Sequence, residues 1–326
     1  MRSEAIAQCS STSLHVGPQR GSLLMVAPLA DILDVGMQQG LEQQRANTAF
    51  ASPLSTEMYA EFYALRKRAS TMTAAAIKWL TTELPARLPA LSQDSGGADS
   101  GSPVIAEPTP FRVLSIGSGS GELDLEVLQM LRARLSPRRP LIYQALEPNP
   151  VHYNECLHAL GPFSGHDATT VEVLPLPFAA PGGFASQERY DLVLFIHVLY
   201  YFPKLIDCLA HALGMLAPSG RVVIVHQTEV GIPELQEAHM MDLRSNREQI
   251  LTTAQVRSQM HEAGLRHDYE EVEAHLDVSE CLRGSEDGLK ILSFCMECDL
   301  RSLDEARRDG LLASLRARVQ LSPTGA

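Results

Sequence analysis

Three closely spaced glycines mark the first place in this sequence where a ligand could bind. They lie in the segment Gly117-Ser118-Gly119-Ser-Gly121, after the apolar run that ends at Ile116. Glycine carries no Cβ atom, so the backbone of a strand-to-helix turn can approach a nucleotide-like ligand closely there. The dinucleotide pattern GxGxxG has its third glycine one position later. The spacing therefore favours a nucleotide-like ligand other than a dinucleotide, with an ordinary tight turn as the alternative interpretation.

Acids that follow the glycines narrow the choice of ligand. Glu122 and Asp124 lie at the expected start of the next helix. Negative charge at that position would repel the pyrophosphate of a dinucleotide. A ligand with a cationic amino-acid end and no phosphate suits the site better, and S-adenosylmethionine matches that description.

A further acid supports this interpretation. Glu147 and Pro148 follow the second apolar run, 141–146. An acid after a strand is usually a solvated turn residue. In this βαβ unit, one strand after the glycine turn, Glu147 is placed to bind ribose hydroxyls.

Aromatic side chains follow a third apolar run, and they could receive a methyl acceptor. Asp191 opens this run, and His197, Tyr200 and Tyr201 come after its carboxyl end. Tyrosine rings can hold a cationic amine by cation–π contact, and a histidine can accept its proton or orient it. The alternative is that the tyrosines pack under the next helix and that His197 is a core histidine.

Methyl transfer from a sulfonium needs little acid–base help. The acceptor must present a lone pair in line with the methyl group, and water must be excluded. We therefore expect His197, Tyr200 and Tyr201 to act at the reacting centre mainly by positioning, with His197 able to take the proton of an ammonium acceptor.

The elements that must hold these residues form an α/β pattern. From residue 111 onward, short apolar runs alternate with helical segments, which predicts βαβ units and a mostly parallel sheet in a Rossmann-like domain. Leu216–Gly220 is interpreted as a helix end and a Pro/Gly turn before the last strand. The predicted strands are 112–116, 141–146, 170–174, 192–196 and 221–226.

The remaining segments are predicted from their composition and periodicity. We expect a disordered tail over 1–52, a helical cap over the active site at 53–90, a flexible linker over 91–110, the cofactor-binding core over 111–230, and a substrate-side extension over 231–326. The cap is expected to open at Ser55-Thr56-Glu57. Within the extension we predict helices over 252–263, 286–298 and 304–319 and an alternating strand over 265–276.

Composition excludes several classes of protein. The chain has 326 residues, a net charge of −12 and a pI near 5.4, so it lacks the basic surface that nucleic-acid binding requires. No apolar run approaches the roughly 20 residues of a membrane span. Six scattered cysteines indicate a reducing compartment, and Cys295-Met-Glu-Cys298 is interpreted as helix packing without a metal. We expect a cytoplasmic protein that is a monomer or weak dimer; the Ser-rich start resembles a transit peptide only faintly.

The motifs together resemble a known family. The glycine loop, Glu147-Pro148, Tyr190-Asp191 and Leu216–Gly220 resemble class I S-adenosylmethionine-dependent methyltransferases over about residues 111 to 227. Further segments are similar to the histamine N-methyltransferase family: Leu114–Glu126, Leu199-Tyr-Tyr, and Asp277–Cys281 followed by Ser285-Glu-Asp-Gly.

The resemblance implies a set of site residues. The cofactor S-adenosylmethionine would be contacted by Gly117, Ser118, Gly119, Gly121, Glu147, Pro148, His152, Ile196 and His197. The amine would be bordered by Tyr63, Met72, His197, Tyr200 and Tyr201.

Two of these positions depart from the family, as does the end of the chain. His197 stands where the family carries a glutamine, and Met72 aligns with a glutamate that recognises the amine. The family's last antiparallel strand has no clear counterpart. These differences predict a bulkier or differently charged amine, or an imidazole or indole nitrogen, in place of histamine.

Other functions remain open from the sequence. Methyl transfer to a hydroxyl, carboxylate or thiol would use the same cofactor site. A nucleotide-binding oxidoreductase is opposed by the early third glycine, and a catalytically silent cofactor-binding protein would bind without turnover.

Overall fold

We describe the protein from a computed structural model that places residues 12–14, 16–19, 50–92, 108–178, 183–244 and 250–319. Most of the predicted tail over 1–52 and of the predicted linker over 91–110 lies outside these residues. The chain divides into two compact units. In its described part, unit 1 comprises residues from Thr73–Gln227 and Thr253–Val272, and unit 2 comprises residues from Ser10–Met72, Thr228–Thr252 and Glu273–Ala326.

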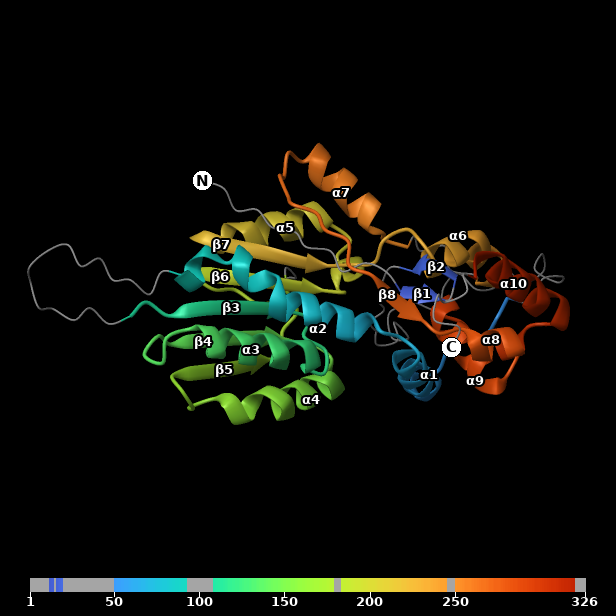
Figure 1. Cartoon of the computed structure of the whole chain (residues 1–326), viewed down its shortest axis with the longest axis horizontal. Helices are drawn as coiled ribbons and strands as arrows, with labels where there is room; N and C mark the ends of the chain where they lie inside the picture. Colours follow the sequence, from blue (N-terminus) through green and yellow to red (C-terminus); the bar gives the residue numbers. More distant parts are fainter. Residues whose placement is uncertain are drawn as a thin grey trace, which may run out of the picture. The chain divides into compact units, whose positions relative to one another are not determined.

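Unit 1 is built on a five-stranded sheet in the order β5-β4-β3-β6-β7 (Figure 1). All neighbouring strands are parallel, which confirms the predicted Rossmann-like architecture. The strands are β3 Phe111–Ile116, β4 Leu141–Leu146, β5 Thr169–Leu174, β6 Tyr190–Ile196 and β7 Leu216–Val225. The first four begin within two residues of their predicted starts, because short apolar runs between turns are typical of parallel strands, although the edge strand β5 exposes Thr170 and Glu172.

Helices cover both faces of this sheet. They are α2 Met72–Thr82, α3 Glu122–Arg134, α4 Pro150–Leu160, α5 Leu205–Gly214 and α7 Thr253–Glu262, with the short 3-10 turns η2 Leu84–Arg87, η3 Pro89–Ser92, η4 Gly161–Phe163 and η5 Leu199–Tyr201. One face, which includes Val113 and Leu194, packs in a common core with apolar residues of α2, α3 and α4. On the other face Phe195 contacts Phe178, which contacts His211 of α5.

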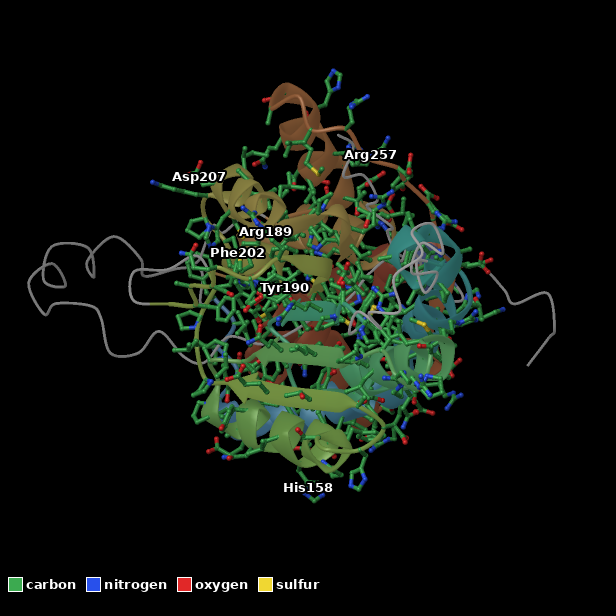
Figure 2. All side chains as sticks on the ribbon, turned by 90° about the vertical axis from the view of Figure 1, so that its left-hand side faces the viewer. His158, Arg189, Tyr190, Phe202, Asp207 and Arg257 are labelled. Carbon is green, nitrogen blue, oxygen red and sulfur yellow. The ribbon has the colours of Figure 1, made fainter. Side chains whose placement is uncertain are left out.

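Figure 2 shows unit 1 viewed approximately along its strands. Tyr190, the first residue of β6, lies near the centre of Figure 2, between His158 of α4 and Arg257 of α7. The two helices therefore lie toward opposite edges of the sheet, α4 on the β5 side and α7 on the β7 side.

The Pro/Gly segment before the last strand differs from its prediction. Leu216–Gly220 belongs to β7 and forms an irregularity, since Tyr190 pairs with Leu216 while Leu192 pairs with Arg221. A Cβ atom at Gly220 would lie 2.5 Å from the carbonyl oxygen of Tyr190. The segment predicted to be a free turn is therefore a bulge that presses against β6.

The strand predicted over 265–276 is wrong for most of its length. Gly264, with a φ of 69°, follows α7, and only β8, Ala274–Leu276, is a strand. Side chains fix the preceding segment instead: Arg87 pairs with Glu270 at 2.5 Å, and the Arg257 guanidinium lies 4.0 Å from the Tyr269 ring centroid. The alternation of polar and apolar residues over 265–273 reflects which side chains are exposed, and it does not show whether the backbone pairs with another strand.

Unit 2 is mainly helical. Its elements are α1 Thr56–Arg68, α6 Ile232–Leu243, α8 Ser279–Arg283, α9 Glu286–Met296, η6 Leu300–Ser302 and α10 Glu305–Arg318, with β8 pairing with β1 Thr12–Leu14 and β2 Val16–Gln19. Ser55 caps α1 by accepting a hydrogen bond from the Met58 N–H, which confirms the predicted helix start. Phe294 of α9 packs against Tyr59 and Tyr63 of α1 at 4.9 and 5.5 Å between ring centroids.

The CxxC cysteines lie in the core of unit 2. Cys295 belongs to α9, Cys298 follows it, and both are buried. Burial raises the pKa of the Cys295 thiol to about 11 and that of Cys298 to about 12. Both side chains are thus neutral packing residues at physiological pH. None of the helices in the described ranges has the length and hydropathy to cross a bilayer.

One polar pair is buried inside the sheet core of unit 1. Asp124, in the first turn of α3, is 2% exposed and accepts a 2.8 Å hydrogen bond from the Tyr143 hydroxyl. Burial raises the pKa of Asp124 to about 6, against hydrogen bonds from Ser115 and Tyr143 that lower it. Of the two acids after the glycine loop, only Glu122 is exposed.

We expect Asp124→Asn to stabilise the protein at neutral pH. Because the folded-state pKa of Asp124 is raised, its carboxyl binds a proton more tightly in the folded chain, and its contribution to stability falls as the pH rises through 6. Asparagine keeps the acceptor for Tyr143 and removes the charge. The variant should exceed the wild type by roughly 2 kcal/mol in unfolding free energy at pH 7.5 and by little at pH 4.

Denaturant unfolding at both pH values measures this difference. Glu122→Gln, which removes an exposed acid from the same helical turn, is the control and should change stability equally little at either pH. A variant that is less stable than wild type at pH 7.5 would show that ionised Asp124 stabilises the fold.

Candidate active site

The glycine loop lies between β3 and α3, and its three glycines adopt a backbone conformation that side chains disfavour. Gly117, Gly119 and Gly121 have φ values of 67°, 56° and 79°, in the left-handed region. A Cβ atom at Gly117 would lie 2.6 Å from Cγ1 of Val198, and one at Gly121 would lie 3.1 Å from the backbone of Cys156. The loop therefore tolerates no side chain at either end.

The loop is fastened to the neighbouring strand. The N–H groups of Gly117 and Ser118 both donate to the carbonyl of Leu146, the last residue of β4, at 2.8 and 3.0 Å. Gly121 then forms the N-cap position of α3. The ends of β3 and β4 thus share one rigid turn.

Glu147 connects this turn to the next helix. One carboxylate oxygen accepts from the Gly119 N–H and the other from the Asn149 N–H, both at 2.8 Å. The residue is 5% exposed. A carboxylate offers about four lone-pair positions, so Glu147 can still accept from the hydroxyls of a ribose. This donor-and-acceptor set fits S-adenosylmethionine.

The other cofactor residue predicted near Glu147 lies on the first turn of α4. His152 follows the cap residue Asn149, whose Oδ1 accepts from the Val151 and His152 N–H groups. The His152 ring Nδ1 lies 3.0 Å from a carboxylate oxygen of Glu155. Pro148 is exposed beside them. Both residues are therefore close in the chain to the Glu147 carboxylate, and their contact with the cofactor stays a prediction.

The end of β6 meets the glycine loop. Ile196 and His197 are 7% and 5% exposed, and the His197 N–H donates to the carbonyl of Val225, the last residue of β7, at 2.8 Å. His197 has a φ of 56°, which non-glycine residues adopt rarely and which often marks a functional site. Its turn directs Val198 against Gly117.

Two tyrosines follow in the short turn η5. The Tyr200 and Tyr201 rings lie 4.6 Å apart at an angle of 61°, and both side chains are half-buried. The next residue, Phe202, anchors the turn by packing edge-on against Phe195 and Phe178 at 5.9 and 6.4 Å. Phe202 therefore anchors the turn that carries the tyrosines, and both tyrosine side chains remain partly exposed.

A second histidine belongs to the same edge, and sequence analysis assigned it no role. His226 follows β7, is fully buried, and its ring lies 6.1 Å from the Tyr200 ring. The strand predicted over 221–226 included His226, whereas β7 ends at Val225, so no signal in the sequence indicated that this histidine lies beyond the strand.

The predicted residues divide between the two units. Unit 1 holds the glycine loop, Glu147, Pro148, His152, Ile196, His197, Tyr200 and Tyr201. Tyr63 and Met72 belong to unit 2, where Met72 is buried and its sulfur lies 3.6 Å from a guanidinium nitrogen of Arg66. Their role toward an acceptor remains a prediction. No three His, Cys, Asp or Glu side chains in the described ranges gather as a metal site would require.

Comparisons with known proteins match this geometry. Residues 64–270 fit the model of a protein family described as "Methyltransferase domain". The chain is 30% identical over 220 residues to histamine N-methyltransferase A of Xenopus laevis, covering 63% of this chain and 73% of that protein. It is 27% identical over 273 residues to histamine N-methyltransferase B of the same species, covering 79% and 87%.

A solved structure of the plantazolicin methyltransferase BpumL, in complex with SAH and a triazolic analogue, shares 12% identity with this chain. The match covers 83% of this chain and 86% of that protein, with a TM-score of 0.36.

We expect Gly117→Ala to weaken S-adenosylmethionine binding by tenfold or more. The new Cβ atom combines a left-handed strain of about 1 kcal/mol with displacement of Val198. Gly165→Ala is the matched control, because Gly165 also has a positive φ of 83° but its Cβ atom would meet nothing within 4 Å. Thermal unfolding should show the left-handed strain in both variants and a larger loss of stability in Gly117→Ala, where Val198 is also displaced, and calorimetric titration with S-adenosylmethionine should show an affinity loss in Gly117→Ala alone. Equal affinities of the two variants for S-adenosylmethionine would show that the glycine loop does not contact the cofactor.

Proposed function

Because this chain belongs to the methyltransferase domain family and uses S-adenosylmethionine as its cofactor, we propose that it methylates a nitrogen of a small amine or of an imidazole- or indole-type acceptor. The observation that carries the proposal is the set of His197, Tyr200 and Tyr201 at the carboxyl end of β6, with Val198 between them packed on the glycine loop. Side chains that suit an amine thus lie next to the loop that suits the cofactor.

Different residues of unit 1 would bind the cofactor and position the acceptor. The glycine loop and the Glu147 carboxylate would hold the amino-acid end and the ribose of the cofactor. When bound, S-adenosylmethionine supplies an electrophilic methyl group on a sulfonium. The tyrosines would position the acceptor by cation–π contact and exclude water from it. His197 would accept the proton that an ammonium acceptor must lose to expose its lone pair, since imidazole exchanges protons near neutral pH.

The acceptor that we propose differs from histamine. The relatives are named for histamine, and at 30% identity or less their acceptor does not transfer by likeness alone. Where the resemblance aligns a carboxylate, this chain has Met72. Replacement of a carboxylate by a thioether supports an acceptor with a larger apolar or differently charged portion.

The cellular setting belongs to the same proposal. All cysteines in the described ranges are free and buried, namely Cys156, Cys208, Cys281, Cys295 and Cys298. Free thiols support a reducing compartment such as the cytoplasm. The net charge of −12 supports a small-molecule acceptor over a nucleic acid. We propose a monomer or weak dimer.

We expect label transfer from methyl-labelled S-adenosylmethionine to one class of amine in a mixed panel of biogenic amines, imidazoles, phenols and thiols. Mass spectrometry of the products identifies both acceptor and methylated atom. Label on oxygen or sulfur would contradict the nitrogen proposal and keep the family. Cofactor binding without transfer to any member would support a silent binding protein.

We expect His197→Asn to lower kcat/KM for the identified amine by at least about tenfold. Asparagine tolerates the positive φ of position 197 and cannot accept the proton, so the loop is kept while the chemistry changes. His158→Ala, on the exposed side of α4, is the control and should leave kcat/KM unchanged. Undiminished kcat/KM in His197→Asn would exclude proton acceptance by this side chain.

A further inference from the structure

We propose that His226 is a positioning residue that fixes Tyr200, and through it Tyr201, in the orientation needed to receive the acceptor. The inference deepens the proposed function and rests on it, since it concerns the same acceptor site. It begins from the placement of two neighbouring strand ends. Ile196 of β6 pairs with Val225 of β7, so His197 and His226 are the first residues beyond the same sheet edge.

The two histidines leave this edge differently. The His197 N–H still donates to the Val225 carbonyl, which extends the pairing by one residue, and its left-handed backbone then turns the chain toward η5. His226 follows β7 without a positive φ. Its imidazole lies beside the turn that carries the tyrosines, with its ring 6.1 Å from the Tyr200 ring.

Rings connect His226 to the acceptor side in a series. The His226 and Tyr200 ring centroids lie 6.1 Å apart with a tilt of 35°, and Tyr200 meets Tyr201 edge-on at 4.6 Å. Both distances fall in the range where ring pairs attract each other. Disturbing the first ring therefore changes the support of the second and third.

Burial assigns the roles within this series. His226 is fully buried, whereas Tyr200 and Tyr201 are half-buried. An acceptor can meet the tyrosines without meeting His226, so the histidine acts through Tyr200. Phe202 supports the turn from its other side through Phe195 and Phe178. His226 is therefore the support that belongs to β7, and Phe202 the support that belongs to β6.

Tyrosine NMR tests the positioning directly. The chain has eight tyrosines, and in ring-labelled protein a Tyr200→Phe variant assigns the Tyr200 signal. We expect this signal to be sharp and dispersed in the wild type, to broaden or collapse toward free tyrosine in His226→Val, and to stay sharp in His226→Phe, which keeps a ring. His158→Val is the control, because His158 is exposed on α4, which follows β4 and is remote in the sheet order from the ends of β6 and β7. A sharp, dispersed signal in His226→Val would overturn the proposal.

Kinetics with histamine and tryptamine as the two probe amines test the consequence. We expect His226→Val to raise the KM for the methylated probe roughly two- to tenfold, with little change in kcat or in the KM for S-adenosylmethionine, and His226→Phe to restore it. In a Tyr200→Ala background His226→Val should add nothing, since its effect passes through that ring. An additive effect, or equal loss in His226→Val and His226→Phe, would contradict the proposal. Failure to methylate histamine agrees with the proposed acceptor, whereas failure to methylate tryptamine contradicts it for this indole amine; in either case the NMR result still decides the role of His226.

Discussion

The loop after β3 and the loop after β6 approach each other so closely at Gly117 and Val198 that only a residue without a side chain fits at position 117. A Cβ atom at position 117 would meet Val198 Cγ1 at 2.6 Å. The first loop follows β3 and the second follows β6, two strands that pair in the sheet although about 80 residues separate them in the chain. Because the contact leaves no gap, movement of either loop must displace the other. The glycine loop and the loop after β6 are therefore coupled through this contact.

Two acids near these loops, Glu147 and Asp124, show how the environment decides the role of a carboxyl group. Glu147 accepts hydrogen bonds from two backbone N–H groups and keeps lone pairs for a ligand. Asp124 has one phenol partner in an apolar core, and burial raises its pKa to about 6. The first acid supplies charge at the strand ends, while the second joins α3 to β4 beneath them. Their separation by 23 positions in the chain gives no hint of this difference.

Much of the sheet of unit 1 could be predicted from the sequence because most of its strands are apolar runs with few exposed residues. β4 was predicted at both of its bounds, and the glycines predicted to form a strand-to-helix turn do lie between β3 and α3. The remaining features depend on partners distant in the chain. Leu216–Gly220 could be recognised as a bulge only from its pairing with β6, and His226 only from the position of the Tyr200 ring. Residues 265–273 pair with no strand of the described ranges, so the polar and apolar alternation there predicted a strand that the structure does not have.

The strand order β5-β4-β3-β6-β7 has a consequence for how this enzyme can change over evolution. The order reverses direction between β3 and β6, so the connections that leave these two strands diverge to opposite faces of the sheet, the arrangement at which ligands bind in open α/β sheets. The half that begins with β3 carries every predicted cofactor residue up to His152, and the half that begins with β6 carries the two tyrosines together with Ile196 and His197. Under the proposed function, substitutions at Tyr200 and Tyr201, which follow Val198 in the chain, could change the acceptor without touching the contact between Val198 and Gly117. The topology of the sheet thus separates most of the predicted cofactor residues from the proposed acceptor residues.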